Sequence, residues 1–291
     1  ITYELAPFHH EMFDILQDPK NKLACIVSFR GSGKSTIITM SYSIWSILGD
    51  QKNRFVLILC RTQAQALLHM SNLKQELETN ELLKSDLGPF REDRDTQWAA
   101  TSLVFPSIDA RITIASLEQS VRGIRHRQHR PDLIILDDIE DVTSVKTYES
   151  RNKTFDWFTR EIIPLGDTHT RVIIVGNLLH DDSLVMRIKR KIQDNEISGI
   201  YREYPLITEN DMCLWPGKFP TIESLELFKR SIISDIAWKR EYLLQIVSED
   251  TQIIQSEWIE YYEDLPNGKP AHLFAAVDPA ISQSAQSDYT A

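Results

Sequence analysis

The most constraining feature of this chain is one short stretch, Ser28-Phe29-Arg30-Gly31-Ser32-Gly33-Lys34-Ser35. An apolar, strand-like run from Leu23 to Ser28 precedes it, and helical spacing follows from Lys34 to Leu48. Closely spaced glycines let consecutive backbone N–H groups surround an anion, and the N-terminus of the following helix adds its positive dipole end. The order strand, glycine loop, lysine, helix therefore predicts a phosphate-binding P-loop.

Each position of this loop has an expected role. Lys34 would reach the β- and γ-phosphates of a nucleotide, and the Ser35 hydroxyl would bind Mg²⁺. The first glycine of the usual pattern is Ser28 here, and a Gly-Ser turn without a ligand is the alternative. The residues predicted to bind nucleotide are Ser28, Arg30, Gly31, Ser32, Gly33, Lys34, Ser35 and Thr36.

A second apolar run, Leu133 to Leu136, ends in two carboxylates and fits the Walker B motif. Asp137 would hold the ATPase Mg²⁺, and the next carboxylate, Asp138, would polarise the attacking water. Glu140 is the rival catalytic base, because glutamate has the longer reach that many such ATPases use. A solvated acidic loop is the alternative for the whole stretch.

A third apolar run, Arg171 to Val175, leads into Gly176-Asn177. Asn177 is predicted to lie beside the γ-phosphate and to sense hydrolysis. Gly-Asn is also ordinary turn chemistry, so a plain turn at the end of a strand is the alternative.

The stretch Arg122 to Arg130 contains four arginines and two histidines. A guanidinium suits phosphate charge, either as an arginine finger or as a contact to a DNA backbone. Arg122 and Arg125 are the candidates for a finger supplied to a neighbouring subunit, with Arg30 acting in its own site. A solvated basic loop is the alternative.

Apolar runs alternate with helical patterns along most of the chain, which indicates an α/β fold. Because the runs are continuous rather than alternating, their strands are expected to be buried on both faces of a mostly parallel sheet flanked by helices. We predict a P-loop NTPase of the ASCE type. Further strands are expected at Phe55 to Cys60 and Arg111 to Ser116, and helices at Gln63 to Glu78 and Tyr148 to Ile163.

The pattern changes after about residue 207. Two prolines in 215–220 are followed by helical patterns at Ile222 to Ile233 and Ile236 to Val247, and Pro266 to Pro270 is a strong turn signal. We therefore expect a motor domain over 1–248, whose part from about 207 is a small helical lid, a linker over 249–270 and the start of another domain over 271–291.

Composition limits the possible partners and compartments. A formal charge of −10 disfavours a protein that coats nucleic acid with a basic surface, but a local basic patch leaves DNA open as a partner. No apolar run is long enough to span a bilayer, and the first residues do not resemble a signal peptide. Three widely spaced cysteines favour a reducing compartment.

With these elements in this order, the chain resembles the large terminase subunits of tailed phages along essentially its whole length. That family has an arginine ahead of Gly-Lys-Ser/Thr, as Arg30 is here, an Arg-Gly element matched by Arg122-Gly123, and a strand ending in Gly-Asn. Its late ATPase region resembles Trp215 to Phe219 and Trp238 to Leu243.

The resemblance implies an ATPase motor, dependent on ATP and Mg²⁺, that translocates double-stranded DNA into a procapsid. It implies a homo-oligomeric ring on a portal, a small terminase subunit as partner, no membrane, and the host cell cytoplasm rather than the mature virion. Where the family often carries a glutamine on the adenine side, this chain has His9 and His10.

The last residues resemble the opening of the family's ribonuclease-H-like nuclease domain. Asp278 would be the first carboxylate of a two-metal site that uses Mg²⁺ or Mn²⁺. The other carboxylates do not occur within these 291 residues, so no endonuclease activity is expected of this chain. Two other functions remain open: a helicase-type translocase, and a nucleotide-regulated DNA-binding module that hydrolyses ATP weakly.

Overall fold

The computed structural model describes residues 2–90 and 98–247. The predicted linker over 249–270 and the segment 271–291, which includes Asp278, lie outside the described residues. Every helix of the described ranges is too short or too polar to cross a membrane.

One sheet forms the centre of the described part of the chain, with the strand order β3-β4-β5-β2-β6-β7-β1-β8. The six strands from β5 to β8 in this order pair in parallel, and β3 and β4 add an antiparallel edge. The prediction of a mostly parallel sheet is confirmed. The strands are β1 Leu23–Ser28, β2 Phe55–Cys60, β3 Trp98–Ala99, β4 Ser102–Phe105, β5 Ala110–Ser116, β6 Leu133–Asp137, β7 Arg171–Gly176 and β8 Ile200–Tyr204.

The central strands formed where their apolar runs predicted them. Strands β2, β6 and β7 are buried along their whole length, because helices cover both faces of the sheet. The sequence did not predict β3, β4 or β8. These strands are short or lie at an edge, and β8 includes the charged Arg202 and Glu203, so none of them has an apolar run longer than three residues.

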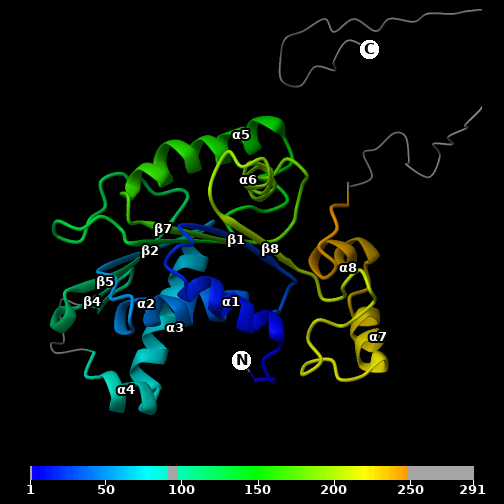
Figure 1. The fold of residues 1–291 in the computed structure, drawn as a ribbon, viewed down its shortest axis with the longest axis horizontal. Helices are drawn as coiled ribbons and strands as arrows, with labels where there is room; N and C mark the ends of the chain where they lie inside the picture. The colour runs from blue at the N-terminus through cyan, green and yellow to red at the C-terminus, as the bar shows by residue number, and fades with distance from the viewer. Residues whose placement is uncertain (1, 91–97, 248–291) are drawn as a thin grey trace, which may run out of the picture. The chain divides into compact units, whose positions relative to one another are not determined.

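Helices lie on both faces of the sheet (Figure 1). On one face, α1, α2 and α3 pack into a single apolar cluster with the sheet, and α5 and α6 contribute to a second cluster on the other face. The bounds are α1 Pro7–Gln17, α2 Ser43–Leu48, α3 Gln63–Thr79, α4 Glu81–Leu87, α5 Tyr148–Trp157 and α6 Leu184–Gln193. The helix after the P-loop starts with a wide π-type stretch, Thr36–Tyr42, and continues as α2.

Two short helices, α7 Ile222–Ser231 and α8 Asp235–Glu241, form the helical part of the chain after residue 207. The rings of Phe228, Trp238 and Tyr242 pack together, with centroids 5.1 Å apart for the last two. The predicted helix Ile236 to Val247 is wrong beyond Glu241. The backbone leaves the helix there, because the Tyr242 carbonyl accepts a hydrogen bond from Leu206 N–H at 2.7 Å and Leu244 takes a φ of 54°.

Candidate functional site

A cavity of about 680 Å³ opens at the carboxyl ends of β1, β6 and β7. Open parallel sheets generally bind ligands at this edge. Most of the residues predicted to carry the chemistry meet here. The cavity is lined by Arg30, Gly31, Gly33, Lys34, Ser35, Thr36, Arg61, Thr62, Gln65, Asp138, Glu140, Asp141, Val142, Asn177, Leu179 and Glu241.

The predicted P-loop has the backbone shape that its glycines allow. Gly31 and Gly33 take φ values of 78° and 89°, a conformation that side-chain-bearing residues rarely adopt. Ser28 and Ser32 are buried and do not line the cavity. These two serines therefore belong to the buried part of the loop. The sequence pattern did not distinguish them from the residues that line the cavity.

The ammonium group of Lys34, which lines the cavity, contacts three oxygen atoms. Its Nζ donates to Asn177 Oδ1 at 2.5 Å, contacts Ser28 O at 3.5 Å and lies 3.7 Å from Asp138 Oδ1. Only 9% of the side chain is exposed. A cation in this position, at the start of a helix, suits a bound phosphate group.

Asp137 is buried at the tip of β6, and its two oxygens have different partners. Ser35 Oγ donates to Oδ1 at 3.2 Å, while Thr39 Oγ1 donates to Oδ2 at 2.6 Å. Burial first, and the neighbouring Asp138 second, raise the pKa of Asp137. A carboxylate beside a serine hydroxyl is the hard-oxygen set that Mg²⁺ prefers when phosphates supply its other ligands, so these residues fit that ion.

Sequence reasoning missed His69, which contacts the same carboxylate. Its Nε2 lies 3.3 Å from Asp137 Oδ2, and the residue comes from α3. A lone histidine within a helical pattern carries no local signal for this position. Only the packing of α3 against the sheet reveals it.

The two candidates for the catalytic base both line the cavity but differ in their surroundings. Asp138 is 38% exposed and has a left-handed backbone, with φ 47°, which aspartate tolerates better than most residues. Glu140 is deeper, and its Oε1 accepts from Leu184 N–H at the start of α6 at 2.9 Å. Burial raises the pKa of Glu140, and its Oε2 has no hydrogen-bond partner among the described residues.

The helical part of the chain contributes Glu241, a residue to which the sequence gave no role. The Arg30 N–H donates to the Glu241 carbonyl at 2.8 Å, and Arg30 Nη1 lies 4.0 Å from Glu241 Oε2. Asn177 Nδ2 donates to the same carboxylate at 3.5 Å. The end of α8 therefore contacts both the P-loop and the residue that follows β7.

Arg122 and Arg125 lie apart from this cavity. They line a separate hollow of about 200 Å³ with Gly123, Ile124, Arg130, Arg160, Glu161, Pro164 and Leu165. Arg122 is paired with Glu161 at 3.2 Å and is 69% exposed. Within the described ranges, neither arginine is placed to contact a nucleotide in the cavity of its own chain.

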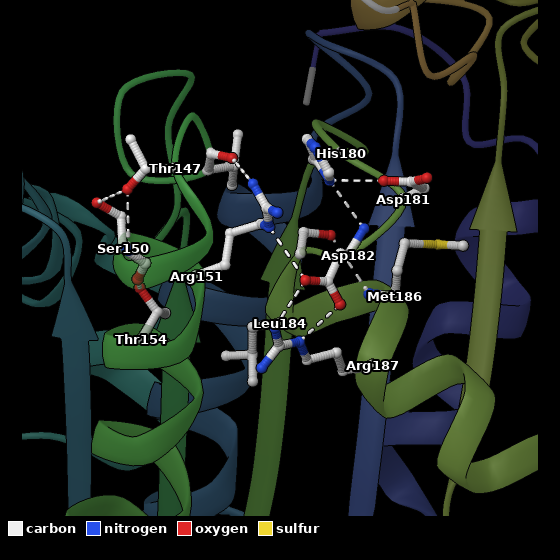
Figure 2. A network of polar contacts seen from close by, with 12 residues as sticks. Thr147, Ser150, Arg151, Thr154, His180, Asp181, Asp182, Leu184, Met186 and Arg187 are labelled. Carbon is white, nitrogen blue, oxygen red and sulfur yellow. Dashed lines mark hydrogen bonds and ion pairs between the residues drawn. The ribbon is translucent and has the colours of Figure 1, made fainter. Parts of the chain in front are cut away.

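An ionic cluster fixes the segment after Asn177 (Figure 2). Arg187 makes two hydrogen bonds to the Asp182 carboxylate at 2.9 and 2.7 Å, and Arg151 Nε donates to it at 3.1 Å. Arg190 adds a contact at 3.3 Å. The two hydrogen bonds from Arg187, and next the one from Arg151, keep the pKa of Asp182 well below its usual range.

The fold is that of phage large terminases. The HK97 bacteriophage large terminase superposes with a TM-score of 0.59 at 13% identity, over 84% of this chain and 51% of that one. The large terminase of a thermophilic bacteriophage gives 0.56 at 10% identity in complex with ADP, over 84% and 54%. In complex with ATP-γ-S the same terminase gives 0.55 at 12% identity, over 84% and 53%.

The chain spans about half the length of these terminase structures. No protein-family model and no curated protein sequence matches it. The likeness is therefore one of fold.

Proposed function

We propose that this chain is the ATP-hydrolysing motor of a viral DNA-packaging machine, which translocates double-stranded DNA. One observation carries the proposal: Lys34, Asp138 and Asn177 line one cavity, with the Asp137–Ser35 pair beside it, in a fold shared with large terminases. Two structures of the thermophilic phage terminase with this fold contain ADP or ATP-γ-S. A homo-oligomeric ring on a portal, a small terminase subunit and action in the host cytoplasm belong to the same proposal.

In this proposal the protein positions the nucleotide and stabilises charge. The P-loop N–H groups and Lys34 bind the phosphates, and Ser35 and Asp137 hold the accompanying Mg²⁺. When bound, that ion neutralises charge that develops on the phosphates. Asn177, which contacts both Lys34 and Glu241, reports the state of the phosphate site to the helical segment.

Steady-state ATP hydrolysis, measured with and without double-stranded DNA, tests this function. We expect turnover that DNA stimulates and that Lys34→Ala abolishes. ATP binding without turnover would favour the nucleotide-regulated DNA-binding module instead. Separation of the strands of a DNA duplex during turnover would favour the helicase-type translocase.

Asp138 is our candidate for the carboxylate that polarises the attacking water, because it lies on the open side of the cavity beside Lys34. Asp138→Asn should keep nucleotide binding and abolish hydrolysis, and asparagine also tolerates the left-handed backbone there. The Oε2 of Glu140, which no described residue contacts by a hydrogen bond, favours the second candidate. If Glu140→Gln binds ATP normally without turnover, while Asp138→Asn hydrolyses it, the role belongs to Glu140.

Arg122 and Arg125 are our candidates for an arginine finger acting on a neighbouring subunit, and Arg30 acts in its own site. A finger supplied in trans accelerates phosphoryl transfer by about 10³–10⁵-fold in related chemistry. Specific activity should therefore rise with protein concentration, and Arg125→Ala should remove that rise. Concentration-independent turnover by a species shown to be monomeric would contradict this assignment.

We further propose that 271–291 begins a nuclease domain in which Asp278 binds Mg²⁺ or Mn²⁺. This chain should not cleave plasmid DNA with either metal. A longer chain that continues past Ala291 should cleave it, and Asp278→Ala in that longer chain should remove cleavage while sparing ATP hydrolysis.

A further inference from the structure

The motif Trp215 to Phe219 contacts the P-loop through Lys218. Its Nζ donates to the Gly31 carbonyl at 2.9 Å and lies 5.1 Å from the Trp215 ring centroid and 5.6 Å from that of Phe219. Burial lowers the pKa of Lys218, because removing the ammonium group from water disfavours its charged form. Among the described residues, those that line the 680 Å³ cavity do not include Lys218. It therefore binds the loop itself rather than the space for a ligand.

His9 contacts the next carbonyl of the same loop. The Ala6 N–H donates to His9 Nδ1 at 2.9 Å, so the ring proton is on Nε2, which donates to Ser32 O at 2.8 Å. The ring is completely buried, and burial lowers its pKa, which favours the neutral ring. The two hydrogen bonds set its tautomer. Trp215 packs edge-on against the ring, with centroids 4.6 Å apart. We call His9, Trp215 and Lys218 the P-loop brace.

These two contacts fix two successive peptide planes. The carbonyl and N–H of a trans peptide point in opposite directions, so a Ser32 carbonyl bound by His9 directs the Gly33 N–H the other way. Gly33 lines the cavity. In the preceding peptide, Lys218 binds Gly31 O while the Ser32 N–H donates to Phe29 O at 3.2 Å and closes the turn.

The brace joins two segments that are far apart in the sequence. Trp215 Nε1 donates to the Glu4 carbonyl at 2.7 Å, which ties the loop at 215–219 to the residues that precede α1. A Cβ on Gly217 would lie 2.8 Å from that same carbonyl, so this close approach requires glycine. Trp215, Gly217 and Lys218 of this motif therefore each have a physical reason for their place.

We propose that Lys218 and His9 are positioning residues that hold the P-loop in its phosphate-binding shape before the nucleotide arrives. The inference rests on the proposed nucleotide-binding function of this loop. A preorganised loop loses less conformational freedom on binding, so the brace acts on nucleotide affinity. It does not act on the chemical step, because neither side chain lines the cavity where that step would occur.

Lys218→Met tests the proposal, because methionine keeps the apolar stem and removes the donor. ADP affinity, measured by calorimetry, should fall about tenfold, in line with a lost hydrogen bond from a charged donor. KM for ATP should rise with kcat nearly unchanged, the pattern of lost ground-state binding. Lys218→Arg should restore most of the affinity. The matched control is Lys229→Met, since Lys229 also lies over an aromatic ring, 5.8 Å from the Trp238 centroid.

His9 provides a second, independent variant. His9→Gln retains one donor and one acceptor and should bind ADP better than His9→Phe, which retains only the ring. Thermal unfolding without nucleotide shows whether each variant is folded, and affinities are compared only among folded proteins.

The outcomes separate this inference from the proposed function. If Lys34→Ala weakens ADP binding while Lys218→Met binds ADP as tightly as Lys229→Met does, the brace is refuted and the function stands. A fall in kcat at unchanged KM for Lys218→Met would also refute it. If neither Lys34→Ala nor Lys218→Met alters ADP binding, both the function and the brace fail.

Discussion

Asp137 and Asp182 both lie near the carboxyl ends of central strands, yet their surroundings are opposite. Asp137 is the last residue of β6, its side chain is 1% exposed, and no arginine of the described ranges pairs with it. Asp182 follows β7, is 28% exposed, and accepts hydrogen bonds from Arg151, Arg187 and Arg190. The pKa is raised for Asp137 and lowered for Asp182.

Under the proposed function, this difference separates a structural carboxylate from a functional one. Asp182 has its full set of donors within the protein, so its charge stabilises the fold. Folding raises the pKa of Asp137, so the ionised form of this buried carboxylate costs stability unless another cation arrives. Native proteins tolerate such costs mainly at functional sites. The comparison therefore supports Asp137 as a ligand-binding group and Asp182 as a stabiliser of the segment after Asn177.

The largest expected effect is on turnover in Asp137→Asn. Loss of a charge that acts on the transferring phosphoryl group should reduce kcat by at least about 100-fold. The same substitution should leave the nucleotide-free protein as stable as the wild type or more so, because asparagine removes the buried charge. ATP hydrolysis and urea unfolding of the same preparation measure both effects. Near-native turnover of Asp137→Asn would contradict the assignment of Asp137 to the site.

Asp182→Asn should show the reverse pattern. Arg151 and Arg187 lose their charged acceptor, so the free energy of unfolding should fall by about 1–3 kcal/mol. Turnover per folded molecule should stay close to that of the wild type. The matched control is Asp181→Asn, since that side chain is 77% exposed and contacts only His180 among the pairs drawn in Figure 2. If Asp182→Asn is as stable as the wild type but has lost turnover, Asp182 has a role in ATP hydrolysis rather than in stability.

The pH dependence of stability should have opposite signs for the two residues. The pKa of Asp182 is lower in the folded state than in the unfolded state, so its contribution is present above about pH 4, the unfolded value, and is lost as pH falls towards the folded pKa. The pKa of Asp137 is raised by folding, so its penalty grows as pH rises above about 4. Urea unfolding between about pH 3 and 7 should therefore show the wild type and Asp182→Asn converging at low pH. If the free energies of unfolding of the wild type and Asp182→Asn differ by the same amount at every pH, the ion cluster around Asp182 does not account for the difference in stability.

The smallest expected effect concerns His69. Thr39 already donates to Asp137 Oδ2, so losing the His69 contact should only loosen the carboxylate. His69→Ala should raise the Mg²⁺ concentration required for half-maximal hydrolysis by about three- to tenfold, at the low end for residues that support a metal ligand. Mn²⁺ binding in the presence of ADP, followed by electron paramagnetic resonance, provides a readout besides activity. His10→Ala, an exposed position on α1, is the control, and equal effects of the two substitutions would contradict the assignment.

The sequence by itself determined the parts of this protein whose signals are local. Continuous apolar runs identified β1, β2, β6 and β7, because strands buried on both faces require them. The glycines and Lys34 predicted the phosphate loop, which stays a prediction, since its backbone conformation and charge belong to neighbouring residues. The same logic located Asp137, Asp138 and Asn177 at strand ends.

Only the tertiary structure decided which distant residues complete the site. Glu241 reaches Asn177 because α8 ends beside the P-loop, and His69 reaches Asp137 because α3 packs against the sheet. His9 and Lys218 contact adjacent carbonyls although they lie 209 positions apart in the sequence. Their side chains act through contacts with no fixed sequence spacing, so no local pattern records them. The early end of α8 has the same cause, since the Tyr242 carbonyl pairs with Leu206 rather than continuing a helix.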